Sequence, residues 1–191
     1  MRRTSHQSAV AAQRLRGLAP IVGANARVLV LGSMPGVASL DAGRYYAHAR
    51  NHFWPFMGEL VGASPELPYP ERSARLAAAG IALWDVIASC RRQGSLDSAI
   101  RDAEANDFPA FLAHHTSIGS LLFNGAAAEA AFMRQVEPAL ARLGLSDGLR
   151  YCRLPSTSPA NAAQPRAAKL AAWRAALNEA GIACDGPSSL P

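Results

Sequence analysis

The side chains that could do chemistry are concentrated in a few short motifs. They are GSMPG at 32–36, YYAHARNHFW at 45–54, LWDVI at 83–87, LFNG at 122–125 and LPSTSPAN at 154–161. Their amides, hydroxyls and single aspartate can donate and accept hydrogen bonds and can orient a water molecule. Such groups can bind a polar ligand by hydrogen bonds.

Strand and helix patterns place four of these motifs at one edge of a sheet. Short buried strands are predicted at 27–32, 80–87, 118–125 and 149–155, with helical patterns at 53–61, 71–79, 108–114, 126–143 and 165–181. This alternation predicts a three-layer α/β/α sandwich with a short, mainly parallel four-stranded central sheet. Ligands of such sheets bind at the carboxyl ends of the strands, where the four motifs lie.

The length of 191 residues favours one domain over 1–191, with a basic helix or tail at 1–20 and a C-terminal tail at 182–191. No apolar run reaches the roughly 20 residues of a membrane span, and 1–20 lacks the apolar core of a signal peptide. The odd, widely spaced set Cys90, Cys152 and Cys184 is typical of a reducing compartment. We therefore expect a cytoplasmic monomer with no metal site, no cofactor and no membrane partner.

Positive charge is unevenly distributed along the chain. Windows 44–52, 86–96 and 150–169 together hold eight Arg or Lys residues and no Asp or Glu, although the whole chain has a net charge of only +5. If these windows meet in space, they form a basic face on a body that is otherwise acidic. If they do not, these arginines are scattered over solvated loops.

GSMPG alone fits neither a P-loop, which needs Lys and Ser or Thr after its glycines, nor a dinucleotide fingerprint. The five motifs in this order, from about 27 to 181, resemble the uracil-DNA glycosylase superfamily, nearest to its hypoxanthine (deoxyinosine) branch. The resemblance implies hydrolysis of the N-glycosidic bond of a deaminated base in DNA, hypoxanthine first, in base excision repair. Lys169 is the single lysine of the chain, which argues against Schiff-base lyase chemistry and for a monofunctional enzyme.

The resemblance also assigns a catalytic residue. It implies that Asn51 orients the attacking water, whereas the local pattern by itself favours Asn51 as the cap of a helix beginning near His52. Met34 stands where many relatives have Asn or Asp, and Leu154 stands where a His often stabilises the departing base. These departures keep open a catalytically silent DNA-lesion binder. Two further hypotheses are a glycosylase that prefers uracil or mismatched uracil, and a nucleotide-binding protein unrelated to DNA.

The remaining roles are predicted with the same resemblance. Phe53 is expected to stack on the extruded base, Asp85 to accept from a ring N–H, and Asn124 to contact the base or begin a helix. The expected base-binding set is Gly32, Ser33, Met34, Pro35, Gly36, Tyr46, Phe53, Asp85 and Asn124. The expected DNA-binding set is Arg50, Arg153, Ser156, Thr157, Ser158, Asn161 and Arg166. The resemblance also implies that residues 159–162 enter the space left by the flipped nucleotide, where relatives often have a leucine wedge. The small residues and Asn161 at this place argue against a strong wedge there.

Overall fold

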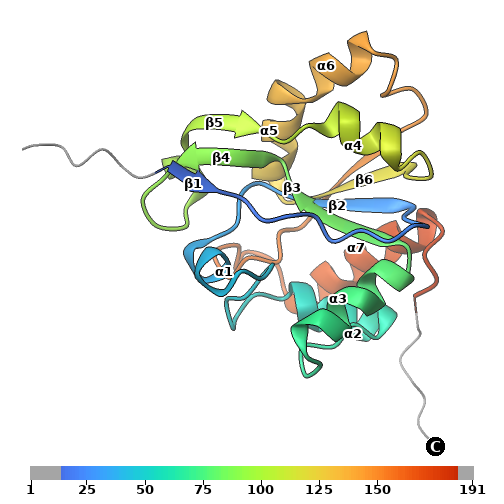
Figure 1. The fold of residues 1–191 in the computed structure, drawn as a ribbon. Helices are drawn as coiled ribbons and strands as arrows, with labels where there is room; N and C mark the ends of the chain where they lie inside the picture. The colour runs from blue at the N-terminus through green and yellow to red at the C-terminus, as the bar shows by residue number, and fades with distance from the viewer. Residues whose placement is uncertain (1–13, 185–191) are drawn as a thin grey trace, which may run out of the picture.

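A computed structural model describes residues 14–184 and arranges them in three layers (Figure 1). The central sheet is parallel with strand order β3-β2-β6-β7. Its strands are β2 (Val28–Gly32), β3 (Ile81–Asp85), β6 (Ser120–Asn124) and β7 (Arg150–Leu154). This confirms the predicted fold class and places one strand of the parallel sheet within each of the four predicted segments.

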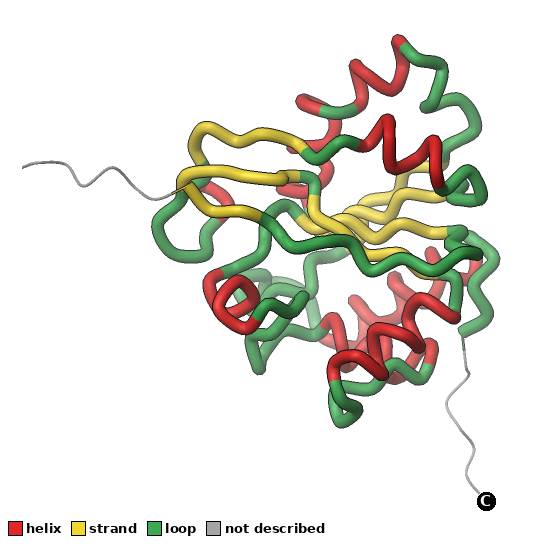
Figure 2. The backbone as a smooth tube through the Cα atoms, in the orientation of Figure 1, coloured by secondary structure: helices red, strands yellow, loops and turns green. Residues whose placement is uncertain are grey.

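Helices cover both faces of this sheet, as the red coils on either side of the yellow strands show in Figure 2. One face carries α4 (Phe108–His114), α5 (Ala126–Gln135) and α6 (Glu137–Arg142). The other carries α2 (Phe53–Val61), α3 (Tyr69–Ala78) and α7 (Arg166–Glu179). The bounds of α2 and α4 are those predicted from the sequence.

The burial of the central strand β2 on both faces explains why its sequence is apolar throughout. Leu29 and Leu31 face the core shared with α5, whereas Val28 and Val30 face the core that contains Trp173 of α7. A strand covered by helices on both faces has no solvent side, so it shows a continuous apolar run instead of alternation. The run ends at Gly32, at the edge where the predicted site lies.

A second, antiparallel sheet was not predicted. It has the order β1-β4-β5 and consists of β1 (Arg14–Arg16), β4 (Ile87–Arg91) and β5 (Arg101–Ala105). The predicted strand 80–87 is in fact two strands, because the chain leaves the parallel sheet after Asp85 and pairs with β5. The predicted N-terminal helix is wrong over Arg14–Arg16, and its first part, 1–13, lies outside the described residues. Strand β1 forms by pairing with the distant β4, and the polar β5 pairs with β4 as a hairpin, so neither shows an apolar pattern of its own.

Three smaller differences concern helices and the C-terminus. The predicted helix 126–143 is two helices, since the break at Val136 starts α6 with a proline in its first turn. A short helix, α1 (Val37–Ala42), follows GSMPG, and a 3₁₀ turn, η1, spans Asp97–Ala99. Ile182 is buried in the core instead of starting a tail, and 185–191 lie outside the described residues.

Candidate active site

A cavity of about 370 Å³ lies at the carboxyl ends of β2, β3 and β6. Cavities of this size suit a small-molecule or base ligand. Eleven of the predicted site residues line it, from all five motifs: Gly32, Ser33, Met34, Pro35, Gly36, Tyr46, Asn51, Asp85, Asn124, Ser156 and Ser158. The motifs therefore converge in space as predicted.

Gly32 is required because Asp85 lies directly across it. The two residues are paired in the β2–β3 register, and a Cβ on Gly32 would sit 2.2 Å from Oδ1 of Asp85 and 3.2 Å from the Tyr46 hydroxyl. Any side chain there would displace the carboxylate. The strand therefore ends in glycine so that an acidic and a phenolic side chain can meet over its last residue.

Asp85 is the buried acid of the cavity. It is 4 % exposed, and its Oδ2 has no hydrogen-bond partner among the described residues. Burial raises the pKa of Asp85 to about 7, with a further upward contribution from Asp97 and a downward one from Arg92. Asp85 lines the cavity, and a carboxylate with unused acceptor capacity at a cavity wall can accept from a ligand N–H.

Asn124 links the cavity wall to the LPSTSPAN loop by hydrogen bonds. Its Nδ2 donates to the Tyr46 hydroxyl (2.9 Å) and to Oγ1 of Thr157 (2.8 Å), and its Oδ1 accepts from the Thr157 backbone N–H (2.8 Å). Both amide protons are thus used within the protein, and Asn124 does not cap α5, whose N-cap is Gly125. Thr157 has no exposed surface, so its predicted contact with DNA is not available in this structure.

Tyr46, and not Phe53, presents its ring to the cavity. Phe53 has no exposed surface, and the Tyr46 ring is stacked on it with ring centroids 4.3 Å apart. Direct stacking of Phe53 on a base is therefore wrong for this structure; Phe53 supports Tyr46 from behind. Tyr46 also has a left-handed backbone (φ 52°), a conformation that non-glycine residues adopt at a cost.

The Tyr46 phenol remains protonated and is oriented as a donor. Burial, together with the Asp85 carboxylate, raises the pKa of Tyr46 above its ordinary value. Its oxygen already accepts from Asn124, which leaves the hydroxyl proton for another acceptor. The cavity thus holds an acceptor, Asp85, and a donor, Tyr46, close to Gly32.

Asn51 lines the cavity and also caps the start of α2. Its Oδ1 accepts from the Phe53 backbone N–H at 2.9 Å, immediately after the turn in which the Asn51 N–H donates to the His48 carbonyl oxygen. An amide oxygen has two lone pairs, so one remains for a water molecule. The capping role and the water-orienting role expected from the sequence are therefore compatible.

The LPSTSPAN loop is organised by its own serines and by Lys169. Ser156 Oγ accepts from Ser158 N–H (3.2 Å), and Ser158 Oγ accepts from Ala160 N–H (3.3 Å), so each hydroxyl keeps its proton for an outside acceptor. Lys169, 2 % exposed, donates from Nζ to the carbonyl oxygens of Ser156 (2.8 Å) and Asn161. The single lysine is thus a buried support of the loop, and burial lowers its pKa.

The predicted basic face is largely neutralised. Arg153 pairs with Glu129 at 3.1 Å, Arg166 pairs with Glu59, and Arg92 is buried with a bond to the Pro35 carbonyl oxygen. Of the exposed basic residues in the three windows, Arg44 and Arg50 form no ion pair with a described residue. Exposed ion pairs contribute only about 0–1 kcal/mol, so they can exchange a carboxylate for a phosphate.

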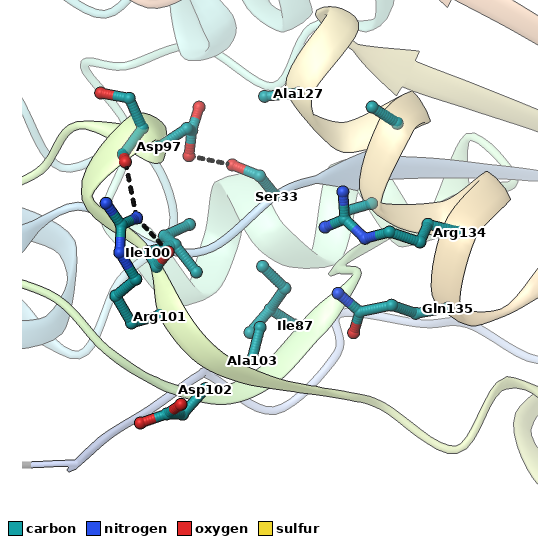
Figure 3. A pocket seen from close by; sticks show the side chains of 13 residues that line it. Ser33, Ile87, Asp97, Ile100, Arg101, Asp102, Ala103, Ala127, Arg134 and Gln135 are labelled. Atoms are coloured by element: carbon teal, nitrogen blue, oxygen red, sulfur yellow. Dashed lines mark hydrogen bonds between the residues drawn. The ribbon is translucent and has the colours of Figure 1, made fainter.

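Sequence reasoning missed one side of the cavity. His48, Ser95, Leu96 and Asp97 also line it, the last three from the loop between β4 and β5. Asp97 Oδ1 accepts from Ser33 Oγ at 2.5 Å (Figure 3). Ser33 and Asp97 also line a second cavity of about 570 Å³ between α5 and β5. No sequence signal linked 95–97 to GSMPG, since the two segments are far apart along the chain.

No membrane-spanning helix was found within 14–184, and the same stretch groups no three His, Cys, Asp or Glu side chains as metal ligands. Cys90 and Cys152 are free thiols.

The fold and the site define the class: an α/β/α protein with a polar, base-sized cavity at the carboxyl edge of its parallel sheet. A family model described as the Uracil DNA glycosylase superfamily matches residues 19–180. This chain belongs to that superfamily and is a DNA glycosylase.

Three known proteins are similar to this chain over more than half of its length. A hypoxanthine DNA glycosylase of Methanosarcina acetivorans is 33% identical over 147 residues, covering 76% of this chain and 87% of that protein. A hypoxanthine DNA glycosylase of Methanosarcina barkeri is 34% identical over 111 residues, covering 58% of this chain and 70% of that protein. The solution NMR structure of a Methanosarcina acetivorans protein, 29% identical, covers 88% of this chain and 99% of its own with a TM-score of 0.71.

Proposed function

We propose that this protein removes hypoxanthine from DNA by hydrolysing its N-glycosidic bond and leaves an abasic site. The observation that supports this most directly is the pairing of an unpartnered acceptor, Asp85, with an oriented donor, Tyr46, inside the cavity. The similar proteins that carry the name hypoxanthine DNA glycosylase favour this base. A cytoplasmic location and a monomeric state stay predictions.

The acceptor–donor pair fits the edge that deamination creates. Hypoxanthine presents a ring N–H beside a carbonyl oxygen, whereas adenine presents a ring nitrogen acceptor beside an amino group. Asp85 would accept from the ring N–H and Tyr46 would donate to the carbonyl oxygen, so adenine would face two mismatched groups. Sites that leave buried polar groups unpaired with the wrong ligand discriminate strongly. Uracil has the same N–H and carbonyl pair, so the edge alone does not separate the two lesions.

Asn51 would hold the attacking water. As the bond to the base lengthens, positive charge develops on the sugar, and a positioned water with nearby acceptors suffices to complete hydrolysis. The Tyr46 hydroxyl would at the same time stabilise the negative charge on the departing base. Lys169 is committed to two loop carbonyl oxygens, which supports chemistry without a Schiff base.

The test uses DNA duplexes with a single hypoxanthine, uracil or xanthine, followed by alkaline cleavage of abasic sites. We expect release of hypoxanthine by the wild-type protein and a loss of at least roughly a hundredfold in the single-turnover rate for Asn51→Ala, within the usual range for a water-positioning group.

Asn51→Ser is the matched variant, because serine is as good a cap as asparagine but has no amide. It should melt like the wild type and still fail to release the base. Full release by Asn51→Ser would move the water-orienting role elsewhere. Tight duplex binding by the wild type without release of any base would identify a lesion binder.

A further inference from the structure

Leu96 is an exposed apolar side chain at the mouth of the cavity. It is 63 % exposed, the most exposed large hydrophobic residue in the described part of the chain, and it lines the cavity beside Ser95 and Asp97. It belongs to the loop between β4 and β5, in the hairpin at the left of Figure 1. Single exposed apolar side chains are common on protein surfaces, so what distinguishes Leu96 is its place in the wall of the cavity.

The loop that carries Leu96 is held firmly. Val37 N–H donates to Ser95 Oγ (3.0 Å) and Ser33 Oγ donates to Asp97 (2.5 Å), so both neighbours of Leu96 are tied to the GSMPG segment. Arg92, at the start of the loop, is buried and donates to the Pro35 carbonyl oxygen. Leu96 is therefore fixed relative to the base cavity, although its own side chain projects into solvent.

The LPSTSPAN loop offers the cavity no large apolar side chain. Its lining residues are Ser156, Ser158, Pro159 and Ala160. An enzyme that extrudes a base leaves a gap in the stack, and apolar side chains are the groups that proteins insert between bases. Leu96 is the large apolar side chain that the described structure places at this rim.

We propose that Leu96 enters the DNA stack and fills the space vacated by the extruded nucleotide. This inference rests on the proposed function, because it requires a duplex from which the base is removed. The duplex is thus held from two sides, with LPSTSPAN hydroxyls on the phosphates and Leu96 in the stack. The role concerns duplex DNA only: a base in a single strand is already unstacked and needs no wedge.

Leu96→Ala and the matched control Leu143→Ala separate this role from a general loss of apolar surface. Leu143 is 60 % exposed and follows α6, and it does not line the cavity. Single-turnover release of hypoxanthine is measured from a duplex with the stable hypoxanthine–cytosine pair and from the same strand alone. We expect Leu96→Ala to lose roughly tenfold or more on the duplex, as an uncompensated unstacking cost implies, and to keep the wild-type rate on the single strand. Leu96→Met should restore most of the duplex rate, and Leu143→Ala should match the wild type on both.

Equal rates of Leu96→Ala and wild type on the duplex would overturn the proposal. So would an equal loss on both substrates, since Leu96 would then contribute to the cavity itself. A second measurement does not depend on cleavage: 2-aminopurine placed beside the lesion brightens when the stack opens, and this signal should fall in Leu96→Ala. If the wild type releases no base from any substrate, the proposed function is wrong, and an unchanged fluorescence signal in Leu96→Ala would then refute the wedge separately.

Discussion

The burial of Asp85 makes a prediction about stability that needs no substrate. Replacing Asp85 by Asn removes an ionisable group whose pKa rises from 3.8 to about 7 on folding. Since the folded protein binds this proton more tightly than the unfolded chain, the free energy of unfolding must fall as pH rises from about 4 to about 7. Above pH 7 both states are ionised at this site and the penalty is constant. Asp85→Asn should lack this component of the pH dependence.

The magnitude follows from the size of the shift. A tenfold change in proton affinity corresponds to about 1.4 kcal/mol, so the full penalty is at most about 4 kcal/mol. Roughly two thirds of it falls between about pH 5 and about pH 8. Relaxation of the surroundings lowers the effective cost of a buried charge below this bound, so we expect Asp85→Asn to gain about 1–2 kcal/mol over wild type between these pH values. For a chain of this size that equals a gain of about 2–8 °C in melting temperature.

The assay is thermal and urea unfolding of both proteins at pH 5, 6, 7 and 8. The informative quantity is the change with pH of the difference between the two proteins, because a fixed cost of the amide cancels in it. Ionisable groups that do not interact with Asp85 contribute equally to both proteins and cancel as well. A difference that stays constant from pH 5 to pH 8 would refute the argument that Asp85 is buried with a raised pKa.

Three further predictions concern groups around the same cavity. Tyr46→Phe should lose roughly ten- to a hundredfold in kcat/KM for hypoxanthine release, because it removes the donor to the base but keeps the ring; a wild-type value would show that the base is recognised elsewhere. Gly32→Ala should lose activity and about 1–3 kcal/mol of unfolding free energy, because its Cβ would lie 2.2 Å from Oδ1 of Asp85. The control Gly119→Ala, whose Cβ would have no neighbour within 4 Å, should resemble wild type in both activity and stability. Lys169→Met should speed hydrogen exchange and proteolysis at 156–161, because it leaves two loop carbonyl oxygens without their donor; unchanged exchange would refute a supporting role.

The parallel sheet and the position of the site could be predicted because both follow from local signals. Continuous apolar runs such as 28–32 indicate strands covered on both faces, and the carboxyl ends of parallel strands meet at one edge. The motifs at those ends therefore had to come together once the fold class was known. The second sheet could not be predicted in the same way. Arg14–Arg16 is polar and short, and it is a strand only because it pairs with the distant β4. Arg101–Ala105 pairs with β4 as a hairpin, but it lacks a continuous apolar run.

Roles inside the site were harder to predict than positions, because a sequence does not show which hydrogen bonds are already used. Asn124 is at the predicted strand end, yet both of its amide protons are consumed by Tyr46 and Thr157. Phe53 is at the predicted helix start, yet Tyr46 lies over it. Leu96 carried no motif at all, and it reaches the cavity through bonds to a segment far away in sequence.

These contacts explain how a cavity lined by amide, hydroxyl and carboxyl groups can select its ligand. Asn124 fixes the Tyr46 hydroxyl as a donor, and the same amide holds Thr157 of the loop predicted to bind DNA phosphates. Movement of the loop on DNA would therefore be transmitted to the donor that faces the base, through a single side chain with no free amide proton. The donor would be correctly placed only when the loop is seated, which links recognition of the base to binding of the strand that carries it. This coupling requires that Asn124→Ala impair base release more on DNA than the loss of the Tyr46 hydroxyl alone, and a smaller effect would show that loop and donor act independently.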